Sequence, residues 1–170
     1  MDAMKQMARL IRMRNRVDAD LAALIGRPAT AWHIGRWIAA QVFGVELEKS
    51  ATKAIGGRLP DGRTVGVRWY LKQEGVLDLR DGGPDLYLVL AGPKAPAASS
   101  RDTVRPMVID AVYLFDAAAV VADLKSRGRK AVTASSVRAE LWDAAEIYPR
   151  HNPAFPLTGE QRALLAELGS

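Results

Sequence analysis

Two strand-like segments, 53–59 and 63–70, are separated by only three residues, Pro60-Asp61-Gly62. This combination is typical of a tight turn, so the two segments are predicted to form a β-hairpin. Strands that follow one another this closely pair antiparallel, because a parallel pair needs a long crossover connection. The hairpin therefore predicts an antiparallel or mixed sheet.

Helical periodicity lies on both sides of the predicted strands. Helices are predicted at 3–25, 30–43, 117–125, 135–145 and 158–168. Further strands are predicted at 45–48, 85–91 and 107–115. The last helix begins with Thr158 and Gln161, whose types and spacing form a capping box. The predicted fold class is α/β (α+β), with a mixed central sheet flanked by helices.

Several other helix ends carry local signals. Thr30 is a predicted N-cap and Gly44 the matching end of the second helix. Asp116 is predicted to cap the helix that follows it. Ser135 or Ser136 is predicted to open the next helix.

The chain has 170 residues, no cysteine and two histidines, His33 and His151. These counts exclude a thiol nucleophile, a disulfide scaffold and a thiolate metal site. One domain is expected, with a helical arm at 1–27, a core at 28–148 and a tail with a helix at 149–170. No apolar run approaches the roughly 20 residues that cross a bilayer, so we expect no membrane insertion and a cytoplasmic location.

The net charge of +5 is unevenly distributed. Residues 1–50 carry eight basic and five acidic side chains, 51–100 carry seven and five, and 101–170 carry nine of each. An excess confined to the first hundred residues favours a polyanionic partner such as nucleic acid. Simple solubility is the alternative interpretation.

The helix predicted at 3–25 is amphipathic. Four basic side chains form one stripe along it: Lys5, Arg9, Arg12 and Arg16. Met4, Met7 and Ile11 lie on the apolar side, which Arg14 interrupts. The basic stripe suits phosphates or an anionic membrane surface, and a solvated helix face is the alternative.

The helix at 30–43 followed by the hairpin resembles the core of the PD-(D/E)xK, or restriction-endonuclease-like, nucleases, and in particular an uncharacterised group among them. The matching stretches are His33-Ile34-Gly35-Arg36, Ser50 to Gly57, Val67 to Tyr70, Glu74-Gly75, Leu86 to Lys94, Ile109 to Asp116 and Ala145 to Pro149. The resemblance implies a metal held by an Asp at the start of one strand and by an acid-x-Lys on the next. Residues two apart on a strand share a face, so that acid and Lys point together at the metal.

The metal-binding acids of that family are replaced at all three positions. Arg36 stands at the helix acid, Gly56 (or Gly57) at the strand Asp, and Gly66-Val67-Arg68 at acid-x-Lys. The resemblance therefore implies a nuclease-like domain that is catalytically inactive and uses no cofactor. Two guanidinium groups would suit phosphate well, because they bind its oxygens bidentately.

The first hypothesis is accordingly a nucleic-acid-binding protein, with DNA the expected partner. The predicted phosphate-contacting residues are Arg36, Lys53, Arg58, Arg63, Arg68 and Lys72, with Lys5, Arg9, Arg12 and Arg16 as a second patch. Tyr70 shares a strand face with Arg68, where it suits either base stacking or core packing.

Two alternatives remain open at the level of sequence. In the first, Glu74 and Asp78 are relocated catalytic acids of an endonuclease that uses Mg²⁺ or Mn²⁺; otherwise they are loop residues paired with Lys72 and Arg80. In the second, the chain is a protein-interaction subunit or homo-oligomer whose N-terminal helix and proline-rich tail serve as docking arms.

Overall fold

A computed structural model describes residues 2–49, 56–80, 82–94 and 105–170. Within these ranges it contains five helices, a mixed six-stranded sheet and a separate two-stranded sheet. The helices are α1 (Asp2–Ile25), α2 (Ala31–Phe43), α3 (Ala117–Ser126), α4 (Ala139–Ala145) and α5 (Gly159–Ala166). The strands are β1 (Glu46–Leu47), β2 (Gly57–Arg58), β3 (Thr64–Tyr70), β4 (Val76–Leu77), β5 (Leu86–Ala91), β6 (Ala111–Asp116), β7 (Ser135–Ser136) and β8 (Glu146–Tyr148). The predicted fold class, a mixed sheet flanked by helices, is confirmed.

The main sheet has the order β1-β2-β3-β5-β6-β8. Its neighbours pair antiparallel except β3 and β5, which run parallel, with Val65 opposite Leu86 and Tyr70 opposite Ala91. The predicted hairpin is present as β2 and β3, in which Gly57 lies opposite Val65. Its first three residues, 53–55, lie outside the described part of the chain.

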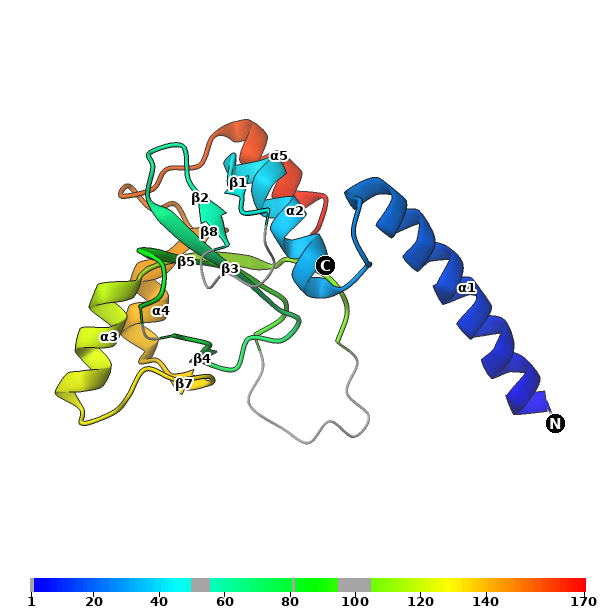
Figure 1. The fold of residues 1–170 in the computed structure, drawn as a ribbon, viewed down its shortest axis with the longest axis horizontal. Coiled ribbons are helices and arrows are strands. Elements are labelled where there is room, and N and C mark those ends of the chain that lie inside the picture. Colours follow the sequence, from blue (N-terminus) through cyan, green and yellow to red (C-terminus); the bar gives the residue numbers. More distant parts are fainter. Residues whose placement is uncertain (1, 50–55, 81, 95–104) are drawn as a thin grey trace.

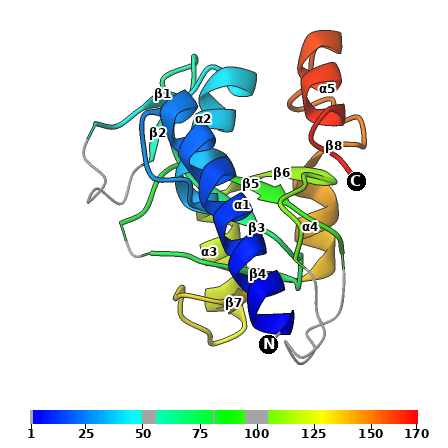
Figure 2. The same ribbon diagram turned by 90° about the vertical axis from the view of Figure 1, so that its right-hand side faces the viewer.

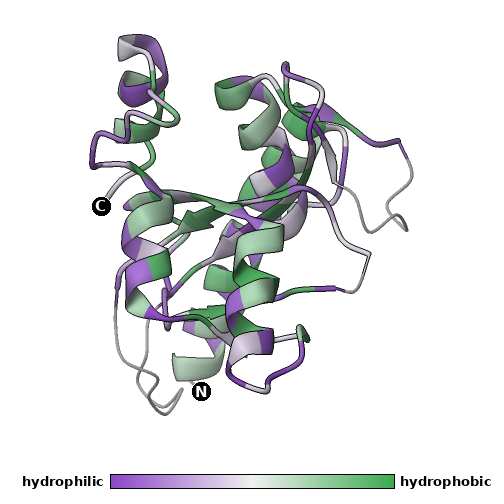
Figure 3. Ribbon diagram, turned by 90° about the vertical axis from the view of Figure 1, so that its left-hand side faces the viewer, coloured by the Kyte–Doolittle hydropathy of each residue, from purple (hydrophilic) through white to green (hydrophobic). Residues whose placement is uncertain are grey.

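Strand β5 lies at the centre of the core, and all six of its residues are buried. Leu88 and Leu90 face α2 and α5, in a cluster that we call the α2-side core. Tyr87 and Val89 face α3 and α4, in a cluster that we call the α3-side core. Figure 1 shows these two pairs of helices on opposite sides of the sheet, and Figure 3 shows hydrophobic residues concentrated along the central strands.

Helix boundaries follow the predicted caps. The backbone N–H of His33 donates to the Thr30 hydroxyl, and Gly44 ends α2 in a left-handed conformation with φ of 66°. The backbone N–H of Ala119 donates to the Asp116 carboxylate at 2.9 Å, which caps α3. These contacts are local in sequence, which is why residue type and spacing alone predict them.

The capping box of α5 is also present. Thr158 and Gln161 bond each other's backbone N–H groups. The Gln161 amide additionally donates to the Val42 carbonyl at 2.9 Å, which ties α5 to the end of α2. Leu165 is fully buried in the α2-side core, so the C-terminal segment is part of the packed structure.

Two predictions about the elements after the main strands are wrong. Ser135 and Ser136 do not open a helix; they form β7, which pairs antiparallel with β4, and α4 starts at Ala139. The Ser135 hydroxyl donates to the Val132 carbonyl and accepts the Val132 backbone N–H, so it is not available to cap a helix. Strand β6 also begins at Ala111, four residues later than predicted.

Helix α1 projects away from the rest of the chain (Figure 1), and in the view from that side it lies in front of the core (Figure 2). Only its C-terminal end is attached, through Leu21 and Ile25, which pack against the α2-side core. Gly26, with φ of 67°, ends the helix and turns the chain toward α2. No described helix combines the length and apolar character needed to cross a bilayer.

We expect Leu88→Ala to lower the free energy of unfolding by about 2–5 kcal/mol, because it opens a cavity beside the central strand. The matched control is Leu164→Ala on α5, where the side chain is 43% exposed and the cost should be below about 0.5 kcal/mol. Chemical denaturation of both variants measures the difference. Equal costs would contradict the position of β5 at the centre of the core.

Candidate nucleic-acid interface

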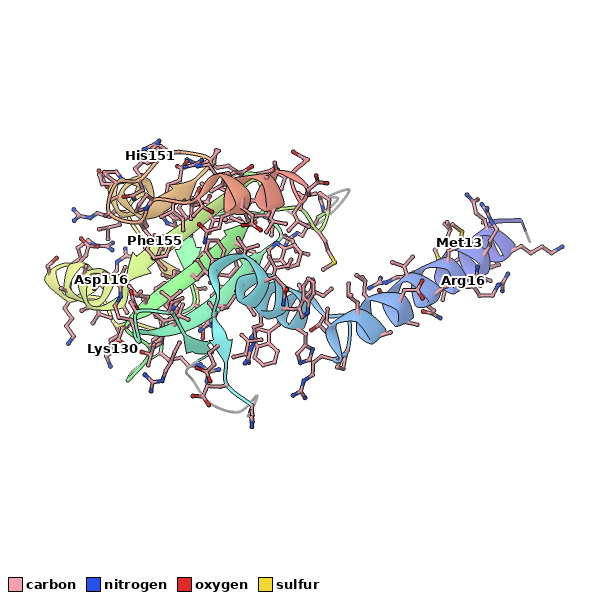
Figure 4. All side chains as sticks on the ribbon, turned by 90° about the horizontal axis from the view of Figure 1, so that it is seen from above. Met13, Arg16, Asp116, Lys130, His151 and Phe155 are labelled. Carbon is pink, nitrogen blue, oxygen red and sulfur yellow. The ribbon has the colours of Figure 1, made fainter. Side chains whose placement is uncertain are left out.

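The four predicted basic residues of α1 all lie in solvent: Lys5, Arg9, Arg12 and Arg16. In the part of the chain that the structure describes, none of them forms an ion pair. Figure 4 shows the side chains of α1 spreading away from the helix on all sides, with Arg16 labelled. Their charges are therefore available to a partner.

The basic residues of the hairpin are partly engaged with its own turn. Arg63 donates twice to the Asp61 carboxylate, at 2.9 and 2.7 Å, and this contact raises the pKa of Arg63 and lowers that of Asp61. Arg58 is exposed and donates to the Gly62 carbonyl at 3.2 Å. Lys53 lies outside the described residues.

Arg68 and Arg36 do not converge. Val67 and Trp69 of β3 face α2, so Arg68 between them points to the opposite side of the sheet. There its guanidinium carbon lies 5.2 Å from the centre of the Tyr87 ring. Arg36 lies on α2, so a phosphate pocket built from both guanidinium groups is not formed.

Tyr70 occupies the same side of β3 as Arg68 and is used structurally. Its hydroxyl accepts the backbone N–H of Asp78 at 2.8 Å. Burial raises its pKa well above the usual value, so the phenol stays neutral. Packing, rather than base stacking, is the role that these contacts describe.

The two relocated acids of the enzyme hypothesis are both paired. The Lys72 amine lies 3.2 Å from the Glu74 carboxylate, with Arg105 at 3.9 Å from the same oxygen. The Asp78 carboxylate accepts the backbone N–H of Ala134 at 2.8 Å. Among the described residues, no three histidine, aspartate or glutamate side chains gather closely enough to hold a metal ion.

Arg36 is a buried clamp. Its side chain is 7% exposed, and one terminal nitrogen donates to the carbonyls of Glu48 and Gly56, both at 3.0 Å. The Glu48 N–H also donates to the Gly56 carbonyl, at 3.1 Å. Arg36 and Gly56 are therefore in direct contact. Their contact ties α2 to the two chain segments that flank residues 50–55.

A cavity of about 220 Å³ lies beside this clamp, where α1, α2 and β1 meet. Trp32 and Trp37 supply aromatic walls, and Arg27 and Lys49 add positive charge. The Arg36 guanidinium carbon lies 4.8 Å from the centre of the Trp32 ring, a cation–π contact. Trp32 remains 39% exposed.

The cavity combines several charges with one fixed imidazole. Burial lowers the pKa of Arg36, Arg27 lowers it further, and Glu48 opposes them. His33 Nδ1 lies 3.0 Å from both the Pro28 carbonyl and the Thr30 hydroxyl, so two polar groups hold the imidazole in place. The mixture of aromatic walls and positive charge suits an anionic ligand with a flat ring, such as a nucleotide of a single strand.

Only Arg36 among the cavity residues was singled out from the sequence as a phosphate contact. Arg27 lies in a turn after α1, and Lys49 follows a two-residue strand. Neither belongs to a recognisable motif. Trp32 and Trp37, five apart on one helix, signal a hydrophobic surface rather than a binding wall.

Comparison of the chain with models of known protein families found no match, and comparison with curated proteins found none either.

We expect Arg36→Ala to lower the free energy of unfolding by about 1–3 kcal/mol, because it removes a charged donor from the Glu48 and Gly56 carbonyls. Thermal melting measures this, with Arg16→Ala as the exposed control. Equal melting temperatures of the two variants would show that the clamp contributes nothing to stability.

Proposed function

We propose that the chain binds DNA through the phosphate backbone, as a nuclease-like domain whose metal-binding acids have been replaced. The observation that carries the proposal is the stripe of four exposed cations on α1, Lys5, Arg9, Arg12 and Arg16. A helix rises 1.5 Å per residue, so the stripe is about 16 Å long. That length covers about five phosphates along one strand of B-DNA.

The cavity beside Arg36 supports the same proposal. The stripe belongs to the helix whose last residue, Ile25, lines that cavity. The stripe ends at Arg16, nine residues before Ile25, so a strand that continues along α1 beyond the stripe would reach two tryptophans and the exposed charges of Arg27 and Lys49. Binding of this kind positions phosphates and stacks bases without reading a sequence.

The test is fluorescence anisotropy of short labelled duplex DNA, single-stranded DNA and RNA at several salt concentrations. Each phosphate contact steepens the dependence of log affinity on log salt by about 0.9 units for duplex DNA and about 0.7 for a single strand. The triple variant Arg9→Gln, Arg12→Gln, Arg16→Gln should therefore flatten the slope by about 2–3 units.

The matched control removes three other exposed charges, by Lys125→Gln, Arg129→Gln and Lys130→Gln, and should leave the slope nearly unchanged. Affinity that does not depend on salt, or equal losses in both triple variants, would refute binding through the stripe. Incubation of plasmid with Mg²⁺ or Mn²⁺ tests the endonuclease alternative, which requires cleavage that Glu74→Gln or Asp78→Asn abolishes.

A further inference from the structure

Helix α1 carries an apolar face that nothing in the described chain covers. Its exposed large hydrophobic side chains range from Leu10, 47% exposed, to Met4, 73% exposed. They are Met4, Met7, Leu10, Ile11, Met13, Val17 and Leu24. An isolated helix is marginally stable in water, and a patch of this kind marks an interaction site.

The spacing along this face indicates what kind of surface covers it. One set of residues alternates steps of four and three, the a and d positions of a coiled coil: Ala3, Met7, Leu10, Arg14, Val17, Leu21 and Leu24. The four basic residues of the stripe fall on the opposite side of the helix, at positions c and f. A helix packed on this seam would therefore leave the stripe in solvent.

Arg14 is the single polar residue of the seam, and it decides the direction of pairing. Its Nε lies 3.5 Å from the Asp18 carboxylate, one turn further along the same helix. In a parallel pair the two Arg14 side chains would stand level and repel each other. In an antiparallel pair, Arg14 of one copy lies opposite Val17 of the other, which brings it close to Asp18 of that copy. Each Arg14 therefore faces an Asp18 of the other helix.

The same antiparallel register places the other apolar residues of the seam opposite one another. Met7 of one copy lies opposite Leu24 of the other, and Leu10 lies opposite Leu21, whose partly buried side chain also packs against its own α2-side core. The paired helices, each about 36 Å long, hold the two cores at opposite ends. The N-terminal end of each helix then reaches the place where Leu21 and Ile25 of the other copy join its core.

We infer that α1 is a dimerisation helix, through which two copies of this chain pair as an antiparallel coiled coil. The pair buries the exposed apolar face and neutralises Arg14 and Asp18 at its centre. Both basic stripes stay on the outside. The inference does not depend on DNA binding.

Sedimentation equilibrium of the full chain tests dimerisation. The wild type should be a dimer at micromolar concentration, and Leu10→Glu should weaken the dimer at least about tenfold because it places a charge in the seam. The matched control, Arg12→Glu on the opposite face, should leave the dimer intact. A monomeric wild type, or equal effects of the two variants, would overturn the inference.

A charge exchange tests the central layer. Arg14→Asp gathers four acids at the centre of the pair, and Asp18→Arg gathers four arginines, so each should weaken the dimer at least about tenfold. The double variant Arg14→Asp, Asp18→Arg restores opposite charges and should restore the dimer, with circular dichroism confirming helix content. Failure of the double variant to recover would refute the charge cluster.

Single introduced cysteines report the direction, because the chain has none of its own. Mixed and oxidised, a Met7→Cys chain and a Leu24→Cys chain should cross-link to each other, since only close Cα atoms allow a disulfide. Each variant alone should stay uncross-linked. Cross-linking of Met7→Cys with itself would indicate a parallel pair and overturn the antiparallel assignment.

Discussion

Burial of β5 on both faces sets the positions of the helices. Leu86, Leu88 and Leu90 require an apolar cover on one side, which α2 and α5 provide. Tyr87 and Val89 require one on the other, which α3 and α4 provide. Neighbouring strands inherit this division because their side chains alternate in step with those of β5. The sheet therefore has two distinct faces, one packed against α2 and α5 and the other against α3 and α4.

That separation explains why Arg36 and Arg68 act independently. In strand β3, which lies beside β5, Val67 and Trp69 point toward α2. Because side chains alternate along a strand, Arg68 between them points to the opposite face of the sheet. Arg68 accordingly meets Tyr87, whereas Arg36 meets the carbonyls of the chain after β1. The two arginines therefore make two unrelated structural contacts, and exposed positive charge lies on α1 and around the cavity.

Most long elements could be predicted from the sequence because their signals are local. Thr30 and Asp116 bond to groups three residues away, and the hairpin turn joins adjacent strands. The short strands β4 and β7 could not, because they acquire their structure only by pairing with each other across a long stretch of chain, whereas the equally short β1 was predicted. Ser135 illustrates the ambiguity, since a serine that suits a helix cap also suits a turn that precedes a strand.

The candidate site was predicted unevenly for the same reason. The α1 stripe follows from helical periodicity, and the structure places its four residues in solvent as that pattern requires. The cavity has no such pattern, because its walls come from the end of α1, the face of α2 and the residues around β1. Arg27 and Lys49 become neighbours of Trp32 only once the chain has folded.

The position of that cavity has a mechanical consequence. Ile25 ends α1 and Arg27 lies in the connection to α2, whereas Trp37 lies on α2 and Leu47 on β1, and Ile25, Trp37 and Leu47 all pack against the α2-side core. A molecule filling the cavity would contact the end of α1 on one side and α2 and β1 on the other. It would thereby fix the angle between α1 and the rest of the domain. Because α1 is roughly 36 Å long, a small change in that angle would move the N-terminal end of the helix by a much larger distance.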